Sequence, residues 1–308
     1  MYIDWVSAAL VSSAILAVVN VVDSHLISKR LPSVHSYLLI LGFMILIVSV
    51  VIIILFPLPD PLDNTSLVMA ILSGVLRAVS VYIMFHTLKK EEVSMVIPIV
   101  NSYPIMVSLL AMPILGEFLG ALQWIAIIIV VSGVILASFR GDSGGRITWS
   151  GRVLSLLLAS SLFYALSEVT AKYALAVISP WQMYSISHFS IAFVFLIIAL
   201  RPRIFKELAR HQKRNSAIII VAFNETIAVA AVVLLYWAMA RGPVSLVSTI
   251  ASTRPVFVFI CALIISRFSG FLLEQQASRS ILLLRFMAIT MIVGGIVIMY
   301  LTRGSISG

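Results

Sequence analysis

The chain is poor in the residues that soluble proteins use for their surfaces and cross-links. Of its 308 residues only 11% are charged, 61% are hydrophobic, and one is a cysteine, Cys261. So much apolar surface cannot be buried inside a water-soluble globule of this size. A single cysteine also excludes a disulfide framework and a cysteine-based metal site within the chain. The composition therefore places the protein in a lipid bilayer.

Ten apolar runs are each long enough to cross the bilayer as a helix. A helix rises 1.5 Å per residue, so about 20 residues span the roughly 30 Å of hydrocarbon. We predict an all-α membrane protein with ten transmembrane helices, at residues 4–28, 34–56, 66–86, 93–115, 118–139, 153–178, 181–200, 216–240, 244–266 and 281–301. The longest connecting loops hold about 15 residues, which leaves no room for a soluble catalytic domain.

The sequence also contains two copies of one unit. Val93, Ser94, Val96 and Pro104 return after 151 positions as Val244, Ser245, Val247 and Pro255, and Ser12, Ser13 and Pro32 return after 148 as Ser160, Ser161 and Pro180. Self-similarity of this kind indicates a duplicated unit. Because each copy holds an odd number of spans, the second enters the membrane in the opposite sense, which makes two inverted five-helix repeats, as in many secondary transporters. We expect the copies at residues 1–140 and 153–303, joined by a Gly-rich basic linker at residues 141–152.

Positive charge is concentrated in the odd-numbered loops. Sixteen of the 21 Lys and Arg lie there, against two in the even-numbered loops and the termini. Because cytoplasmic loops concentrate Lys and Arg, we expect the odd-numbered loops in the cytosol and both termini outside, in an integral protein of the plasma (cell) membrane. This topology accounts for the net charge of +9, so we expect no nucleic-acid partner.

Six ionisable residues lie inside the predicted spans, where a charge at the bilayer centre opposes insertion by roughly 2.5–3.5 kcal/mol. They are Asp23, Arg77, Glu168, Lys172, Glu225 and Arg254. Four of them share a mid-span depth, which indicates one cavity between the copies: Arg77, Glu168, Glu225 and Arg254. Glu168 also precedes Lys172 by four residues, the spacing of an ion pair along one helix face. Each of these residues also has an alternative role that involves no solute. Lys172 can extend to the membrane interface, Asp23 can stabilise the end of its helix, and the others can form fixed structural ion pairs.

Neutral polar residues near these charges complete the predicted site. Tyr164 extends the face of Glu168 by one helical turn, and Asn20 is the counterpart of Glu168 in the first copy. Asn224 immediately precedes Glu225. The two copies therefore carry different chemistry at matching places, as a site for an asymmetric solute requires.

Two prolines mark matching points in the fourth and ninth spans. Tyr103 precedes Pro104, and its counterpart Arg254 precedes Pro255. A proline inside a helix removes one backbone hydrogen bond and crowds the carbonyl four residues earlier. We therefore expect kinks at both prolines, with freed backbone polar groups near the midplane site.

These residues receive the following roles. We expect Arg77, Lys172 and Arg254 to bind an anionic group of the solute, with hydrogen bonds from Asn20, Tyr103, Tyr164 and Asn224. Glu168, Glu225 and Asp23 are candidates for binding an ammonium group or a coupling proton, because a desolvated carboxylate favours its protonated form.

Four motifs of the chain carry a family resemblance. They are the run from Val93 to Pro104, its counterpart from Val244 to Pro255, Leu115-Gly116-Glu117 at the end of the fourth span, and Gly133-Val134 in the fifth. Together they resemble the drug/metabolite transporter superfamily, EamA type, over nearly the whole chain. The resemblance implies a secondary transporter with a central cavity between its two halves. The chain departs from the family pattern where Arg267-Phe268 replaces the Gly-Glu pair in the second copy, and in its expected external termini, since the family is commonly drawn with cytoplasmic ones.

We therefore predict a secondary active transporter for a small polar or zwitterionic, amino-acid-like solute, working by alternating access around a midplane site. Proton coupling stays open at this point. The alternatives are a carrier or exchanger for phosphorylated or nucleotide-linked sugars, and a channel or non-transporting receptor on the same scaffold. We expect no enzyme, metal or cofactor, because the spans hold no His-x-x-x-His spacing and no nucleophile with a nearby base. The sequence predicts no particular oligomeric state.

Overall fold

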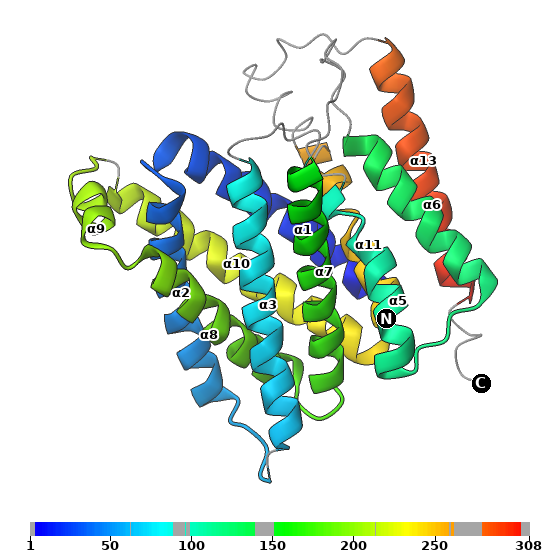
Figure 1. Ribbon diagram of the computed structural model, residues 1–308, viewed down its shortest axis with the longest axis horizontal. Coiled ribbons are helices and arrows are strands. Elements are labelled where there is room, and N and C mark those ends of the chain that lie inside the picture. Colours follow the sequence, from blue (N-terminus) through cyan, green and yellow to red (C-terminus); the bar gives the residue numbers. More distant parts are fainter. Residues whose placement is uncertain are drawn as a thin grey trace.

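All regular secondary structure that the computed structural model describes is helical. It describes residues 4–61, 63–88, 96, 99–138, 151–212, 214–258, 260–261 and 279–302. The helices are α1 (Trp5–His25), a π-helix η1 (Leu26–Arg30), α2 (Val34–Leu55), α3 (Asn64–Leu88), α5 (Tyr103–Leu115), α6 (Ala121–Ser138), α7 (Gly151–Ala174), α8 (Pro180–Ala199), α9 (Pro202–Ala209), α10 (Arg214–Arg241), α11 (Val244–Ala251) and α13 (Arg279–Thr302) (Figure 1). The predicted motifs at Val93-Ser94 and Arg267-Phe268, and linker residues 141–150, lie outside these ranges.

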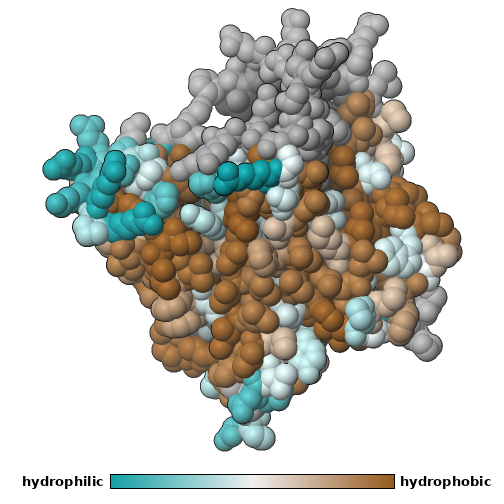
Figure 2. Space-filling model, in the orientation of Figure 1, coloured by the Kyte–Doolittle hydropathy of each residue, from teal (hydrophilic) through white to brown (hydrophobic). Residues whose placement is uncertain are grey.

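The described helices have the length and composition of membrane spans. Six of them are long and apolar enough to cross a bilayer, namely α1, α2, α3, α7, α8 and α10, and four shorter apolar helices accompany them. Figure 2 shows hydrophobic side chains across the middle of the visible face, with hydrophilic ones near α9 and at the opposite end. Large apolar side chains such as Ile54, Phe223 and Leu301 are mostly exposed. A belt of this size on a protein surface is typical of contact with lipid, so the chain is an integral membrane protein.

Helices of the first copy pack mainly on helices of the second. α3 lies against α7, and the counterpart pair, α10 against α1, is also formed. α2 packs on α8 and α6 on α13, and in both of these pairs a helix meets its own counterpart. α5 also packs on α11, so the fourth span meets the ninth. Figure 1 shows α6 and α13 side by side at one edge of the molecule. This pattern of contacts has the two-fold relation that the sequence repeat predicts.

Serine hydroxyls at the repeated positions make matching hydrogen bonds. Ser12 Oγ donates to the carbonyl of Ala231 at 2.7 Å, and its counterpart Ser160 donates to the carbonyl of Ser80 at 2.9 Å. All three serines are fully buried. Small hydroxyl residues let helices approach closely in lipid and bond across the interface. The repeated serine pairs in the sequence thus mark where α1 meets α10 and where α7 meets α3.

The fourth and ninth spans are interrupted, and do not merely kink. Residues 101–102 form a turn before α5, and residues 252–253 form a turn after α11, with helix resuming at Arg254. In both turns an amide bonds the carbonyl three residues back, from Ser102 to Ile99 at 3.2 Å and from Thr253 to Ile250 at 3.1 Å. The predicted kinks are therefore breaks, because each proline takes the second position of a new helix, where its missing N–H is not needed.

Hydroxyl groups satisfy the carbonyls that these breaks release. Ser102 Oγ bonds the carbonyl of Ile99 at 2.7 Å, and Thr253 Oγ1 bonds the carbonyl of Ile250 at 2.7 Å. The second serine of each repeated pair adds a bond to the same carbonyl, from Ser161 to Ile99 at 3.1 Å and from its counterpart Ser13 to Ile250 at 3.4 Å. Unsatisfied backbone groups are costly away from water, so these hydroxyls make two discontinuous helices tolerable inside a bilayer.

Candidate functional site

A buried ion pair stands where α3 packs on α7. The guanidinium of Arg77 pairs with the carboxylate of Glu168, whose residue is 1% exposed. Arg77 Nε also donates to Ser167 Oγ at 3.4 Å. The second carboxylate oxygen of Glu168 accepts a hydrogen bond from Ser248 Oγ of α11 at 3.2 Å. Three helices thus meet at one carboxylate, which the close packing of α3 on α7 places away from lipid.

Two tyrosines cover this ion pair. The Tyr164 ring lies 4.8 Å from the guanidinium carbon of Arg77, within the range of a cation–π contact. The Tyr103 ring meets Tyr164 edge-on at 4.5 Å, and its hydroxyl donates to the carbonyl of Ser248 at 3.0 Å. Tyr103 begins α5 and Ser248 belongs to α11, so this bond ties the two half-length helices together beside the ion pair.

Arg254 adds a second guanidinium to the same place. It follows the break after α11 and interacts electrostatically with Tyr164, Tyr103, Arg77 and Glu168. Its Nε is buried and has no hydrogen-bond partner among the described residues. We call Arg77, Tyr103, Tyr164, Glu168, Ser248 and Arg254 the arginine cluster. With two arginines and one carboxylate, its formal charge is +1.

A second polar group lies where α1 packs on α10. The amide nitrogen of Asn224 donates to Asp23 Oδ1 at 2.7 Å, and Tyr37 also hydrogen-bonds the Asp23 carboxylate. The hydroxyl of Tyr184 donates to Glu225 Oε1 at 2.9 Å. We call Asp23, Tyr37, Tyr184, Asn224 and Glu225 the acid cluster. Neither carboxylate pairs with a cation among the described residues, so the cluster has an excess of negative charge.

Three residues of α8 and α10 lie between the two clusters. The His188 ring stacks on Tyr184 of the acid cluster at 4.0 Å, and His188 interacts electrostatically with Arg77. Tyr236 interacts electrostatically with Arg77 and Tyr184, and its hydroxyl lies 3.1 Å from Ser187 Oγ. None of these three residues was among the predicted site residues. Their signal was weak, because a tyrosine or histidine in a span is more often a packing residue.

Lys172 lies one helical turn beyond Glu168 on α7 but does not pair with it. Its Nζ donates to the carbonyls of Met239 at 2.5 Å and Gly242 at 2.9 Å, at the C-terminal end of α10. The prediction of an ion pair between Glu168 and Lys172, made from their four-residue spacing, is therefore wrong. Glu168 is occupied by Arg77 from another helix, and helix C-terminal carbonyls attract the lysine.

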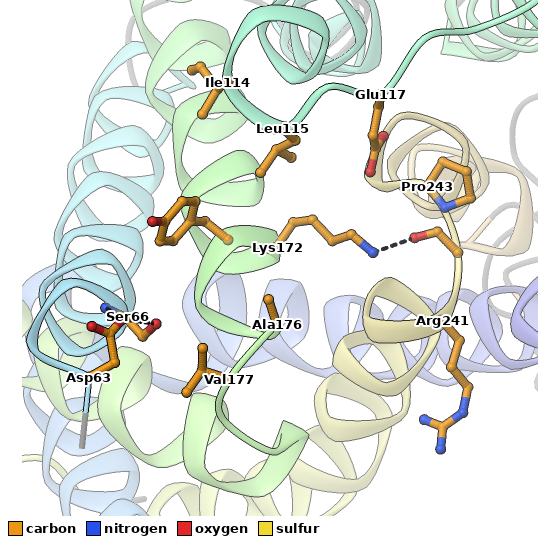
Figure 3. A pocket seen from close by; sticks show the side chains of 12 residues that line it. Asp63, Ser66, Ile114, Leu115, Glu117, Lys172, Ala176, Val177, Arg241 and Pro243 are labelled. Atoms are coloured by element: carbon orange, nitrogen blue, oxygen red, sulfur yellow. Dashed lines mark hydrogen bonds between the residues drawn. The ribbon is translucent and has the colours of Figure 1, made fainter. Parts of the chain in front are cut away.

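Lys172 lines an open pocket with a volume of about 640 Å³, which we call the mouth pocket. The residues around it are Asp63, Ser66, Ile114, Leu115, Glu117, Lys172, Tyr173, Ala176, Val177, Arg241, Gly242 and Pro243. They come from the ends of α3, α5, α7 and α10, where the even-numbered loops join these helices. Figure 3 shows Lys172 reaching from α7 toward Pro243, with Asp63 and Ser66 on the other side of the pocket.

Glu117 holds the start of α11 at the edge of this pocket. Its carboxylate accepts from the amide of Val244 at 2.9 Å and from the amide and hydroxyl of Ser245 at 3.4 and 3.1 Å. Gly116 ends α5 in the left-handed conformation, with φ of 68°, which glycine adopts without strain. This turn directs the chain so that Glu117 reaches α11. The Gly-Glu motif of the first copy therefore caps a helix of the second.

The structure divides all but one of the predicted site residues among three places. Arg77, Tyr103, Tyr164, Glu168 and Arg254 come together in the arginine cluster, while Asp23, Asn224 and Glu225 belong to the acid cluster. Lys172 lines the mouth pocket, and Asn20 is an exposed residue of α1. The prediction of one shared group of four ionisable residues thus fails for Glu225. Equal depth does not bring residues together when their helices pair with different partners. The part of the chain that the structure describes holds no group of three His, Cys, Asp or Glu side chains placed to bind a metal.

The sequence profile of the EamA-like transporter family matches residues 4–139 and again residues 151–301. The chain belongs to this family. Membership makes the protein a membrane transporter of the drug/metabolite type. The family is one of transporters and not of enzymes. The profile thus matches the chain twice, once in its first half and once in its second.

Comparison with solved structures supports the same fold. A structure described as "Crystal structure of protein" superposes with a TM-score of 0.66 at 16% sequence identity, covering 99% of this chain and 98% of the other. At this identity the likeness concerns the fold alone. A comparison with curated proteins gives no match.

Proposed function

We propose that this EamA-family protein is a secondary carrier for a small amino-acid-like zwitterion, which it binds at the arginine cluster and moves by alternating access. One observation carries the proposal: the buried Nε of Arg254 has no hydrogen-bond partner among the described residues. Leaving a buried charged donor unsatisfied costs more than about 1–3 kcal/mol. A solute oxygen that accepts this bond recovers that free energy, which favours binding.

The charge of the arginine cluster favours a single carboxylate as the anionic group. Arg77 is already paired with Glu168, so one positive charge is left, on Arg254. A carboxylate neutralises it and accepts two parallel N–H bonds from the planar guanidinium. A phosphate monoester, with a charge of roughly −1.5 to −2 at neutral pH, would leave a net negative charge in a low-dielectric site. This balance ranks the sugar-phosphate alternative second.

The same cluster offers partners for the ammonium group of a zwitterion. Glu168 is the one carboxylate among the residues of the arginine cluster, and the faces of Tyr103 and Tyr164 attract cations. An ammonium group placed there shares Glu168 with Arg77. The helix break at residues 252–253 supports this assignment, since transporters commonly bind their solute where spanning helices are discontinuous.

The acid cluster supports proton coupling. Its two carboxylates interact electrostatically with each other and lack a cationic partner among the described residues. Two carboxylates that repel each other disfavour double ionisation, which suits this pair to hold a proton. We propose that Asp23 and Glu225 share the coupling proton, while the arginine cluster binds the solute.

Counterflow in proteoliposomes tests the carrier function. Vesicles preloaded with an unlabelled amino acid are expected to take up the same labelled compound faster than empty vesicles, across a panel of amino acids. Arg254→Gln is expected to lower this uptake by about 10- to 100-fold, the range for losing a charged hydrogen bond. The matched control is Arg201→Gln, which removes an exposed arginine at the start of α9, outside both clusters.

Three outcomes would oppose the proposal. Uptake without stimulation from the opposite side would indicate a channel, and unchanged counterflow in the Arg254→Gln protein would show that the solute binds elsewhere. Uptake that is stimulated by preloaded sugar phosphates, and not by any amino acid, would favour the second candidate substrate.

A further inference from the structure

We propose that the mouth pocket is a second, outer binding site for the anionic group of a solute, with Lys172 and Arg241 as its ligands. The inference rests on the proposed carrier function for its purpose, because an outer site would capture the solute before it reaches the arginine cluster. The outer site and the arginine cluster have no residue in common.

The acidic residues of the mouth pocket are occupied by helix N-termini. Glu117 accepts three hydrogen bonds from Val244 and Ser245 at the start of α11. Asp63 accepts from the amide of Thr65 at 3.4 Å and from the amide and hydroxyl of Ser66 at 2.8 and 2.6 Å. The hydrogen bonds from Ser66 hold the pKa of Asp63 below its ordinary value. Both carboxylates are thus engaged within the protein and offer few acceptor positions to a ligand.

The basic residues of the pocket have donors to spare. Lysine carries three donors, and Lys172 uses two of them on backbone carbonyls. The guanidinium of Arg241 carries five donors. It makes no hydrogen bond or ion pair with side chains or carbonyls of the described residues, and its central carbon lies 4.0 Å from the centre of the Trp237 ring. Glu117 interacts electrostatically with Lys172 but forms no ion pair with it. The pocket therefore presents N–H donors to a ligand, which selects for a carboxylate or another oxyanion.

The position of Lys172 connects this pocket to the arginine cluster. Lys172 and Glu168 are four residues apart on α7, an axial rise of about 6 Å. Arg241 is exposed at the end of α10, whereas Lys172 is half-buried. A solute anion that first meets Arg241 and then Lys172 advances to within one helical turn of the Arg77–Glu168 pair. The charges of the pocket thus mark an approach path from the even-loop side.

Trp237 provides a direct readout of anion binding. The purified full-length protein in neutral detergent is titrated with sodium phosphate, with sodium chloride at equal ionic strength as the reference, while tryptophan fluorescence is recorded. An oxyanion bound by Arg241 is expected to change the contact between its guanidinium and the Trp237 ring. The expected result is a saturable change with phosphate that chloride does not reproduce, and its loss in Trp237→Phe.

Four variants within the pocket and one control outside it assign the signal to the pocket. Arg241→Gln is expected to abolish the change, and Lys172→Gln to weaken phosphate binding about tenfold, the effect of one charged hydrogen bond. Arg241→Lys and Lys172→Arg are expected to retain binding, which separates charge from a folding defect. Arg201→Gln, outside the pocket, is expected to titrate like the wild type. A saturable signal that survives in both glutamine variants, or its absence from the wild type, would overturn the proposal.

Two further arms separate this proposal from others. In nanodiscs of phosphatidylcholine the phosphate titration is expected to persist. If it persists there but is abolished when phosphatidylglycerol is added, the ligand is a lipid headgroup and the solute site is refuted. The Arg254→Gln protein is expected to keep the fluorescence titration while counterflow falls. Failure of the carrier proposal and failure of the outer site are therefore seen in different measurements.

Discussion

The arginine cluster and the acid cluster occupy interfaces that the sequence repeat makes equivalent, yet their chemistry is opposite. At the α3–α7 interface Arg77 pairs with Glu168, whereas the counterparts of these residues at the α10–α1 interface are Ala228 and Asn20. The acid cluster shows the reverse relation, since the counterpart of Glu225 is Gly74. A duplicated scaffold thus supplies two similar helix interfaces in a bilayer, and divergence has placed basic chemistry in one and acidic chemistry in the other.

The largest difference is expected when one partner of the ion pair is removed. Glu168→Gln leaves Arg77 buried without its counter-charge, which typically costs about 3–5 kcal/mol of stability. The loss is measured by unfolding in mixed detergent and SDS micelles. The double variant with Arg77→Gln serves as the control, and it is expected to be more stable than Glu168→Gln alone. A single variant as stable as the wild type would show that the pair does not hold this interface together.

A substitution at Gly74 tests why the first copy has no counterpart of Glu225. A Cβ at this position would lie 2.1 Å from the backbone carbonyl oxygen of Ser187, so Gly74→Ala forces α3 away from α8. Overpacking of this kind costs about 1–3 kcal/mol. Gly294→Ala is the matched control, because a Cβ there meets no atom within 4 Å. Equal stability of the two variants, measured as above, would contradict the close approach of α3 and α8.

Replacing Glu225 is expected to separate coupling from binding. In Glu225→Gln the side chain still accepts from Tyr184, so folding and counterflow are retained. Accumulation driven by one pH unit, about tenfold for one proton per solute and equivalent to about 1.4 kcal/mol, is expected to fall to the level of equilibration. This accumulation is measured as the uptake of labelled solute into vesicles loaded with acidic buffer, compared with vesicles loaded with neutral buffer. Undiminished accumulation would remove Glu225 from the coupling role.

The smallest effects are expected where the two interfaces are alike. Ser12→Ala and Ser160→Ala each remove a hydroxyl bond to a carbonyl, across the α1–α10 and α3–α7 interfaces respectively, with an expected cost of about 1 kcal/mol. Ser160→Ala also removes the 3.1 Å contact with Ser80 Oγ. The two losses of stability should agree within about 0.5 kcal/mol, as measured by unfolding. A large inequality would indicate that the matching geometry conceals different energetics.

The sequence predicted the features that depend on local pattern and repetition. The apolar runs predicted the six described helices that are long and apolar enough to cross a bilayer, and the repeated serines proved to be contact points between the copies. The prolines marked the interrupted helices, although a break was predicted only as a kink. All three charged residues of the arginine cluster were also identified, because a charge within a span is rare and costly.

The partners of these residues could not be predicted, because they depend on which helices pack together. Local spacing indicated Glu168 and Lys172 as a pair, but α3 brings Arg77 to Glu168 and the end of α10 brings carbonyls to Lys172. Glu117 was noted only as part of a motif. Its role in capping α11 requires the turn at Gly116 and the approach of the second copy of the repeat. Neither feature leaves a periodic pattern in the sequence.

The bond from Ser12 to Ala231 has a consequence for how the protein is made. The two residues are 219 positions apart, so the first helix leaves the ribosome long before its partner has been synthesised. Until then α1 must reside in the membrane with its hydroxyls bonded within its own turns, as Ser13 is to the carbonyl of Ala9 at 2.7 Å. Neither half is therefore expected to mature alone, and early termination products would expose the faces of α1 and α3 to cellular quality control.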